Sequence, residues 1–212
     1  MSTTTENEDF IVSGGVIKDF VGDPKAVVEL VIPAEAKEFS DKFKKCLYHE
    51  MTSVRKVTVP KGSLAFSTHC GVLYDKKMET LLFYPRAKRR KAYRMPGTVK
   101  RIADMAFANS GLWSVDMPET LEHIGKKAFA NTNLVCPTLP TNLKTIAKDA
   151  FKGCDNLHIL NIPNEDVVIT KNGLDLEEGT IVLVETRNPI DHSKYAGLRV
   201  MNEEEFDKWL EE

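Results

Sequence analysis

Residues 99–110 read Val-Lys-Arg-Ile-Ala-Asp-Met-Ala-Phe-Ala-Asn-Ser, and the same pattern returns at residues 121–132 and 143–154. The phenylalanines of the three copies, Phe107, Phe129 and Phe151, lie 22 residues apart. A fixed period of roughly 20–50 residues is typical of a chain that stacks repeated units into a solenoid. The repeat therefore predicts a solenoid.

Prolines recur with nearly the same period as the phenylalanines, at positions 96, 118, 140 and 163. Three of the four prolines end a short segment in which apolar and polar residues alternate, at residues 93–96, 115–118 and 160–163. Alternation of this kind predicts a half-buried strand. Proline lacks the N–H that a sheet ladder needs, so it suits the end of a strand. Each repeat is thus predicted to contain a strand, a turn and a compact Ile-x-x-x-Ala-Phe segment.

Less regular copies lie upstream. Residues 30–33 and 57–60 have the same strand ending, and residues 39–46 resemble a shortened compact segment. Residues 10–18 and 66–74 both place Gly-Val between apolar runs, which predicts two inserted β-hairpins.

The period fades after Pro163, where residues 167–169 and 180–184 predict two further strands. Asn202 followed by Glu205 predicts a helix start. Phe206, Trp209 and Leu210 give that helix one apolar stripe, which we expect to cover the open end of the stack. We predict one domain over residues 8–212, behind a disordered polar tip at residues 1–7. It comprises degenerate repeats (8–90), regular repeats (91–163) and a C-terminal cap (164–212).

The stretch from Ile146 to Pro163 resembles the repeat of the BspA-like leucine-rich repeat family. The resemblance covers about residues 8–165 and is clear from about residue 90 to residue 163. It implies an α/β protein, by convention: a right-handed leucine-rich repeat solenoid with short parallel strands, N-terminal β-hairpin insertions and a C-terminal capping helix. It also implies a role in adhesion and in binding other proteins.

Composition sets limits on function and location. The chain has 212 residues, of which 29 are basic and 31 acidic, so its net charge of −2 does not drive binding to nucleic acid or membrane. No apolar run approaches the roughly 18 residues of a membrane span, so we expect no membrane insertion. The polar, acidic start and the four cysteines favour a reducing, cytoplasmic location. A cell-surface or secreted location follows instead if an N-terminal signal has been trimmed.

The predicted strand face is the first candidate binding surface. Alternation directs the second residue before each proline outward, and parallel strands stack about 4.8 Å apart, so six strands are expected to form one concave surface of roughly 25 Å. Its mixed polar character suits a protein or peptide partner, whose identity the sequence leaves unknown. The candidate binding residues are Thr58, Arg94, Trp113, Ser114, Asp116, Thr138 and Asn161.

The basic segment at residues 86–101 gives an alternative, in which the chain binds an anionic polymer such as nucleic acid or a sulfated glycan. Tyr84 and Tyr93 flank it as possible stacking groups. The same charges also fit a solvated sheet edge, because long charged side chains discourage edge pairing, or a targeting signal. The candidate anion-binding residues are Arg86, Lys88, Arg89, Arg90, Lys91 and Arg94.

The sequence contains little that indicates a catalytic or metal site. Cys46, His49, His69 and Cys70 supply zinc-type ligands, but no second Cys-x-x-Cys or fixed His spacing accompanies them. The repeat alignment instead places Cys46 and Cys154 in a column with Ser110 and Thr132, which predicts small buried side chains. Neither a Gly-x-Ser-x-Gly elbow nor a phosphate loop occurs. We therefore expect no catalytic residue, no metal, no cofactor and no enzymatic activity.

Overall fold

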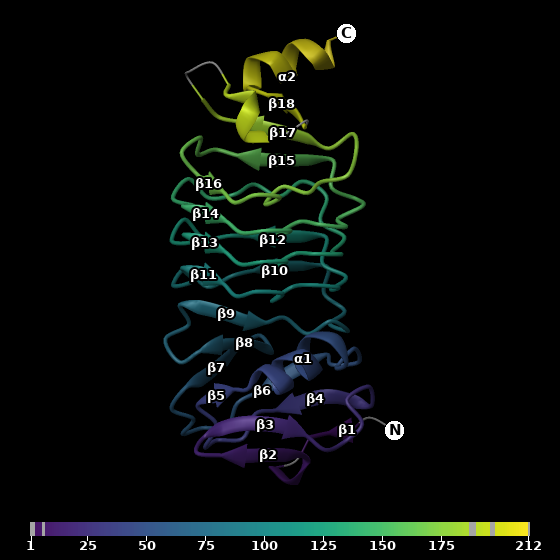
Figure 1. Cartoon of the computed structure of the whole chain (residues 1–212), viewed down its shortest axis with the longest axis vertical. Coiled ribbons are helices and arrows are strands. Elements are labelled where there is room, and N and C mark those ends of the chain that lie inside the picture. The colour runs from purple at the N-terminus through teal and green to yellow at the C-terminus, as the bar shows by residue number, and fades with distance from the viewer. Residues whose placement is uncertain (1–2, 6, 187–189, 196–197, 212) are drawn as a thin grey trace.

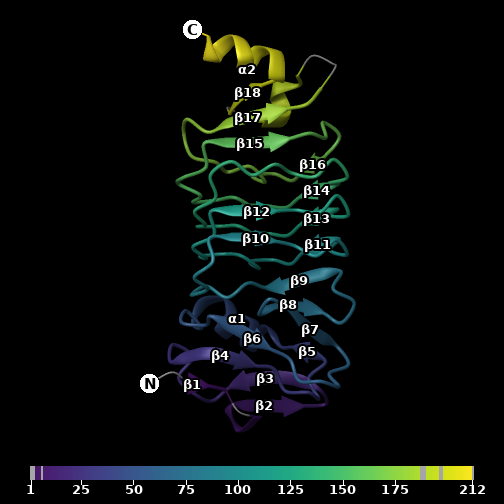
Figure 2. The same cartoon turned by 180° about the vertical axis from the view of Figure 1, so that it is seen from behind.

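The repeated segments stack as successive coils along one long axis (Figure 1). The computed structural model describes residues 3–5, 7–186, 190–195 and 198–211. Helix α2 (Glu203–Leu210) lies at the C-terminal end of the stack, and the view from behind shows the same order of coils (Figure 2). The predicted solenoid of short parallel strands is confirmed.

The strands that end at or near proline occur where the alternation predicts them. They are β4 (Val27–Val31), β6 (Lys56–Thr58), β10 (Ala92–Arg94), β12 (Ser114–Asp116) and β15 (Ile159–Ile162). β10 pairs with β12 in parallel, with Tyr93 opposite Val115. Both of these side chains are buried, whereas Arg94 and Asp116 are exposed. The predicted inward and outward positions are therefore confirmed in these two strands.

A second sheet, which the sequence analysis does not predict, forms at the isoleucine of each repeat. This long sheet has the strand order β16-β14-β13-β11-β9-β8-β7. Ile102, Ile124 and Ile146 point into the core and are at most 1% exposed. The repeat strands of this sheet span only two residues, which is too short for a visible alternation. The bounds are β7 (Phe66–His69), β8 (Val72–Asp75), β9 (Thr80–Phe83), β11 (Arg101–Ile102), β13 (His123–Ile124), β14 (Thr145–Ile146) and β16 (Val168–Ile169).

The phenylalanines of the repeat form a continuous buried stack. The Phe129 ring lies 4.9 Å from the Phe107 ring and 5.3 Å from the Phe151 ring, centroid to centroid. The backbone N–H of Phe107 donates to the carbonyl of Ala128 in the next coil at 2.8 Å, and that of Phe129 donates to Ala150 at 2.8 Å. Each coil reaches this geometry through two left-handed turns, at Met105, Lys127 and Asp149 and at Asn109, Asn131 and Gly153.

Two antiparallel hairpins occur in the N-terminal part of the stack, and the second adjoins the regular repeats. β2 (Phe10–Ser13) pairs with β3 (Val16–Phe20), and β7 pairs with β8, as the two Gly-Val segments predict. Side chains on the two faces of β8 pack in different clusters of the core. Leu73 packs in the N-terminal cluster, whereas Val72 and Tyr74 pack in the cluster of the regular repeats. The hairpin thus connects the two clusters.

Two N-terminal segments differ from the prediction. Residues 39–46, predicted to be a shortened compact segment, lie largely in helix α1 (Asp41–His49), which begins where Ser40 Oγ accepts the N–H of Phe43 at 3.1 Å. β5 (Glu38–Phe39) precedes this helix. In the tip predicted to be disordered, β1 (Thr3–Thr4) pairs with β4, and η1 (Asn7–Asp9) is a 3₁₀ helix. Residues 1, 2 and 6 lie outside the described residues.

The C-terminal region follows the prediction in part. β16 and β17 (Ile181–Val184) confirm the two expected strands, whereas β18 (Arg199–Met201) and the 3₁₀ helix η2 (His192–Tyr195) are not predicted. α2 begins at the expected capping box of Asn202 and Glu205 and contacts β17 and β18. None of its residues is buried, and Leu210 is 63% exposed. α2 therefore covers this end of the stack only partly.

Candidate functional site

Four predicted binding residues gather on or beside β10 and β12, which form the centre of a surface that we call the short-strand face. This face comprises the outward side chains of β10, β12, residues 136–138 and β15. Arg94 Nε donates to Asp116 Oδ2 across the two strands at 2.6 Å, and both side chains are largely exposed. An exposed pair of this kind contributes little to stability. Its two charges remain accessible to a partner.

Trp113 presents an aromatic ring at the start of the strand that carries Asp116. The residue immediately precedes β12, and 48% of it is exposed. Lys91 Nζ lies 3.9 Å from the centre of the ring, which is a cation–π contact. The backbone also fixes the two residues, because Trp113 N–H donates to the Lys91 carbonyl at 2.7 Å. A positioned, half-exposed tryptophan is the kind of side chain that anchors protein interfaces.

Small and polar side chains extend the face toward β15. Ser114, Cys136 and Thr138 are exposed, and Thr138 forms a parallel bridge with Asn161. Asn161 Oδ1 is buried and has no hydrogen-bond partner among the described residues. A buried acceptor without a partner is costly to the fold, and this oxygen is not accessible to a molecule on the face.

The predicted surface of six continuous strands is wrong in two places. β4 and β6 belong to a separate sheet with β1, because the turn between β7 and β8 lies beside β6, where Val57 N–H donates to the Gly71 carbonyl at 2.9 Å. Thr58 is therefore set apart from the other candidates, and its Oγ1 donates to Glu29 Oε1 at 2.6 Å. In the third regular repeat, Pro137 has no N–H to donate, and only the Thr138–Asn161 bridge forms.

The basic segment does not form one exposed patch. Arg86 is half-buried, its Nε and Nη2 have no partner among the described residues, and burial lowers the pKa of its guanidinium. Lys88 is also half-buried and donates from Nζ to the Cys70 carbonyl at 2.6 Å. Tyr84 and Tyr93 are only 1% and 6% exposed. The prediction that these tyrosines could stack on a ligand is wrong, because their rings belong to the core.

A hollow of about 360 Å³ lies between β10 and the β7–β8 turn, and we call it the basic hollow. The side chains of Arg90 and Lys88 line it together with Arg94, so the two predicted sets of candidates meet there. His69 and Cys70 complete its polar lining, and none of its lining residues is acidic. The 22-residue period does not reveal this feature because the turn lies outside it. A signal is nevertheless present in Gly71, since the tight hairpin turn has positive φ at both Cys70 and Gly71 and glycine adopts such an angle readily.

The cysteines and histidines considered as zinc ligands are either buried in the core or exposed at the surface. Cys154 is buried in the same column as Ser110 and Thr132, as predicted. The predicted place of Cys46 in that column is wrong, because Cys46 lies in helix α1 and packs in the N-terminal cluster, where burial raises the pKa of its thiol to about 11. Cys70 is exposed, with its Sγ 3.4 Å from His69 Nε2. Within the described ranges, no group of three or more His, Cys, Asp or Glu side chains is arranged to hold a metal ion. The same residues contain no helix with the length and apolar character needed to cross a membrane.

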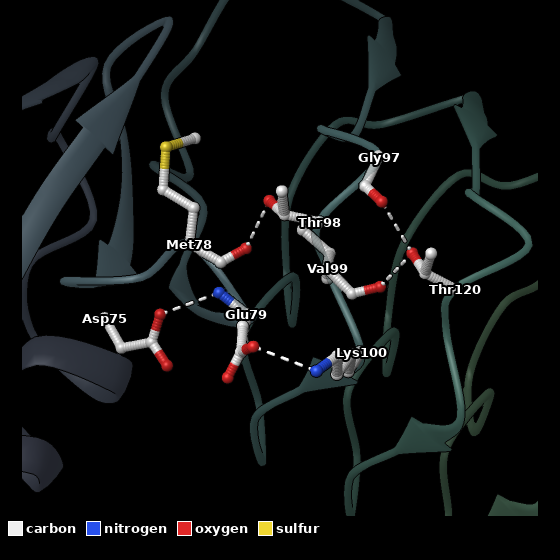
Figure 3. Close-up of polar contacts among 8 residues, drawn as sticks. All are labelled: Asp75, Met78, Glu79, Gly97, Thr98, Val99, Lys100 and Thr120. Atoms are coloured by element: carbon white, nitrogen blue, oxygen red, sulfur yellow. Dashed lines mark hydrogen bonds and ion pairs between the residues drawn. The ribbon is translucent and has the colours of Figure 1, made fainter.

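The long-sheet side differs because its polar groups bond one coil to the next. Thr98 Oγ1 donates to the Met78 carbonyl at 2.9 Å, and Lys100 Nζ lies 2.9 Å from Glu79 Oε1 (Figure 3). Thr120 Oγ1 donates to the carbonyls of Gly97 and Val99 in the preceding coil (Figure 3). Arg94 and Asp116 pair between coils in the same way on the short-strand face, but that face also presents the half-exposed ring of Trp113 and small polar side chains. The contrast favours the short-strand face as the candidate site.

Comparison with known proteins agrees with this architecture. Residues 77–175 match the BspA type leucine-rich repeat region, in six copies. Among solved structures, a leucine-rich cell surface protein of Faecalibacterium prausnitzii has a TM-score of 0.68 at 21% identity, over 92% of this chain and 53% of that one. The pneumococcal vaccine antigen PcpA has a TM-score of 0.65 at 23% identity, over 87% of this chain and 53% of its own.

A leucine-rich repeat protein of Eubacterium ventriosum gives a TM-score of 0.60 at 19% identity, over 84% of this chain and 49% of that chain. At these identities the likeness shows the fold alone. The present chain spans about half the length of these solved chains. A search of curated proteins finds no match.

Proposed function

Since residues 77–175 of this chain belong to the BspA-type leucine-rich repeat family, we propose that the protein is a non-enzymatic recognition module that binds a protein or peptide through its short-strand face. The repeats supply the scaffold, because each coil buries its apolar side chains only against its neighbours. The outward residues of each coil are then free to vary with the partner.

The observation that carries this proposal is the grouping of Trp113, Arg94 and Asp116 on adjoining strands. The strands are short and bonded in register, so a partner meets these side chains in fixed positions. The aromatic ring supplies apolar contact area, and the two charges supply orientation. A surface of this composition suits docking of another protein.

Adhesion is the cellular role that we propose for this binding. It follows the general character of the family, and one of the solved neighbours is described as a cell surface protein. The alternative, binding of an anionic polymer, has less support, because Arg86 and Lys88 are half-buried and both candidate stacking tyrosines lie in the core.

A triple variant tests the proposal. Partners captured by the full chain from its native cells or their surroundings are compared with those captured by a chain carrying Arg94→Ala, Trp113→Ala and Asp116→Ala. We expect the variant to lose the specific partner, because both the anchor and the orienting charges are gone. Circular dichroism and urea unfolding show whether the variant keeps its fold.

A matched triple variant on the long-sheet side serves as the control. Arg101→Ala, Lys126→Ala and Lys148→Ala also remove three exposed side chains, and this variant should capture the same partner as the unmodified chain. If the short-strand variant retains the partner, or if both variants lose it to the same extent, the short-strand face is not the binding surface.

A further inference from the structure

We propose that the basic hollow receives an acidic side chain from an extended segment of the partner, and that this contact selects acidic sequences at the short-strand face. The inference rests on the proposed function, and it names the chemistry of the partner. The charge of the lining, the unpaired edge of β10 and the size of the hollow support it.

The lining of the hollow is cationic without a compensating acid. Arg90 is exposed at its rim, Lys88 is half-buried, and Arg94 completes the lining from β10. Asp116 on the neighbouring strand β12 already accepts the Nε proton of Arg94 at 2.6 Å. Asp116 lies outside the hollow, so Lys88 and Arg90 are the cations of the lining that no acidic side chain of the described residues pairs with. A second carboxylate entering from solvent would meet Lys88 and Arg90, which no acidic side chain neutralises within the hollow.

The free edge of β10 offers backbone hydrogen-bond donors beside the cationic side chains of the hollow. Among the residues that the structure describes, β10 pairs only with β12, so its other edge is unpaired, and residues 92–97 of this segment line the hollow. Within the same residues, the N–H groups of Ala92 and Arg94 have no backbone acceptor. An unpaired strand edge is the feature that extended peptides use when they dock by main-chain hydrogen bonds. The hollow therefore offers both N–H donors and cations to one acidic segment.

The size of the hollow favours a short peptide segment over nucleic acid or a long glycan. A hollow of about 360 Å³ accommodates one or two residues of a peptide, whereas a nucleic acid duplex or a long glycan would need a broad exposed patch. Arg86 and Lys88 are half-buried, and of the exposed cations Arg89, Arg90, Lys91 and Arg94 only Arg90 and Arg94 line the hollow. The observations thus favour a short acidic segment of a protein.

Peptide selection tests the proposal directly, because it needs only the full chain and a library of sequences. Random eight-residue peptides displayed on phage are selected against the full chain, and the most enriched sequence is synthesised with a fluorescent label. We expect Asp or Glu to be enriched and binding to weaken with added salt. In fluorescence anisotropy, Arg90→Gln should raise the Kd about fivefold, because one charged contact is lost. Arg89→Gln is the matched control, since Arg89 is exposed next to Arg90 but does not line the hollow, and it should change the Kd less than about twofold.

The two exposed cysteines report where the peptide binds. Cys70 lines the hollow, whereas Cys136 lies on the short-strand face outside it, and Cys46 and Cys154 are buried. Bound peptide should slow the alkylation of Cys70 by iodoacetamide several-fold and leave the alkylation of Cys136 unchanged.

Several results would overturn the inference. They are selection without enrichment of acidic residues, equal effects of Arg89→Gln and Arg90→Gln, unchanged alkylation of Cys70, and tighter binding of a heparin fragment or single-stranded DNA than of the peptide. Failure here is distinguishable from failure of the proposed function. If the triple variant on β10 and β12 loses its native partner while the hollow binds no acidic peptide, protein recognition stands and only the specificity pocket is wrong.

Discussion

Phe129 lies between two parallel aromatic rings, fully buried, with one neighbour from each adjoining coil. The position shows how the repeat is stabilised: the same side chain fills the same place in three coils, and each ring packs against the next one. Removal of the middle ring leaves a cavity that faces both neighbours. Because the coils depend on each other, neither can close that cavity alone.

Phe129→Ala is expected to lower the free energy of unfolding by about 3–5 kcal/mol, since a buried aromatic side chain is lost and a cavity remains. Urea unfolding monitored by circular dichroism measures the loss. Trp113→Ala is the control, because Trp113 is half-exposed, and it should cost less than about 1 kcal/mol. A loss under about 1 kcal/mol for Phe129→Ala would show that the phenylalanine stack is not core.

Gly153 ends a column in which the first two coils have asparagine. Asn131 Nδ2 donates to Asn109 Oδ1 at 2.9 Å, and all three residues have positive φ. A Cβ on Gly153 would lie 2.3 Å from Asn131 Oδ1. The glycine is therefore required both by the left-handed backbone and by the close approach of the asparagine.

Gly153→Ala is expected to destabilise the protein by about 1–3 kcal/mol, through positive φ and steric conflict with Asn131. Gly97→Ala provides the comparison, because a Cβ there meets no atom within 4 Å and its φ is not positive. Thermal unfolding of both variants tests this expectation, which equal melting temperatures would contradict.

The sequence predicts single residues well where they belong to the repeat. The buried phenylalanines, the small Ser110–Thr132–Cys154 column and the outward Arg94 and Asp116 all follow from position in the period. Prediction fails where the environment comes from outside the period. Tyr84 and Tyr93 flank charged residues in the sequence, yet they pack against Phe107 in the core.

At the scale of elements, the long sheet is held by polar pairs between neighbouring strands. His123 on β13 contacts Thr145 on β14, with Nδ1 and Oγ1 2.8 Å apart, and lies 3.8 Å from Glu122. Burial lowers the pKa of His123, and the nearby positive charges of Arg101 and Lys144 act in the same direction, while Glu122 opposes them. The structure therefore favours the neutral imidazole.

This shift predicts a pH dependence of stability. The unfolded chain binds the His123 proton more tightly than the folded chain, so this contribution is full above the ordinary pKa of 6.5 and declines as the pH falls toward the lower folded pKa. His123→Gln should reduce the decrease in unfolding free energy between about pH 7 and pH 5. Urea unfolding across this range measures the slope, and identical slopes in the two proteins would exclude His123 as a contributor.

The elements differ in how far the sequence reveals them. Strands of three or four residues that end near proline show alternation, and hairpins show Gly-Val turns, so both are predicted. The two-residue strands of the long sheet carry only one inward side chain each, so no alternation marks them. Helix α1 forms in a segment whose sequence resembles the repeat, so the resemblance predicts the wrong structure there. Pro137 was visible in the sequence, but its effect on the ladder depends on pairing with the next coil.

For the whole molecule, we propose that the two sides of the stack have different roles. Charged and hydroxyl groups on the long-sheet side pair between coils, as with Glu122 and Lys144 at 2.9 Å. On the short-strand face, Trp113 and several small side chains are exposed, and in our proposal they contact a partner. The basic hollow lies on this face because the β7–β8 turn separates β6 from β10 there. The 22-residue repeat does not predict this separation, because the turn belongs to an inserted hairpin.

Site-specific photocrosslinking tests the assignment of this face most directly. A benzophenone is attached to Cys136 in a chain carrying Cys70→Ser, so that Cys136 is the remaining exposed cysteine while Cys46 and Cys154 are buried. The control chain carries Cys70→Ser, Cys136→Ser and Lys148→Cys, which places the same probe on the long-sheet side. We expect the native partner to crosslink from Cys136 and not from position 148. Crosslinking from position 148 alone, or equally from both positions, would contradict it.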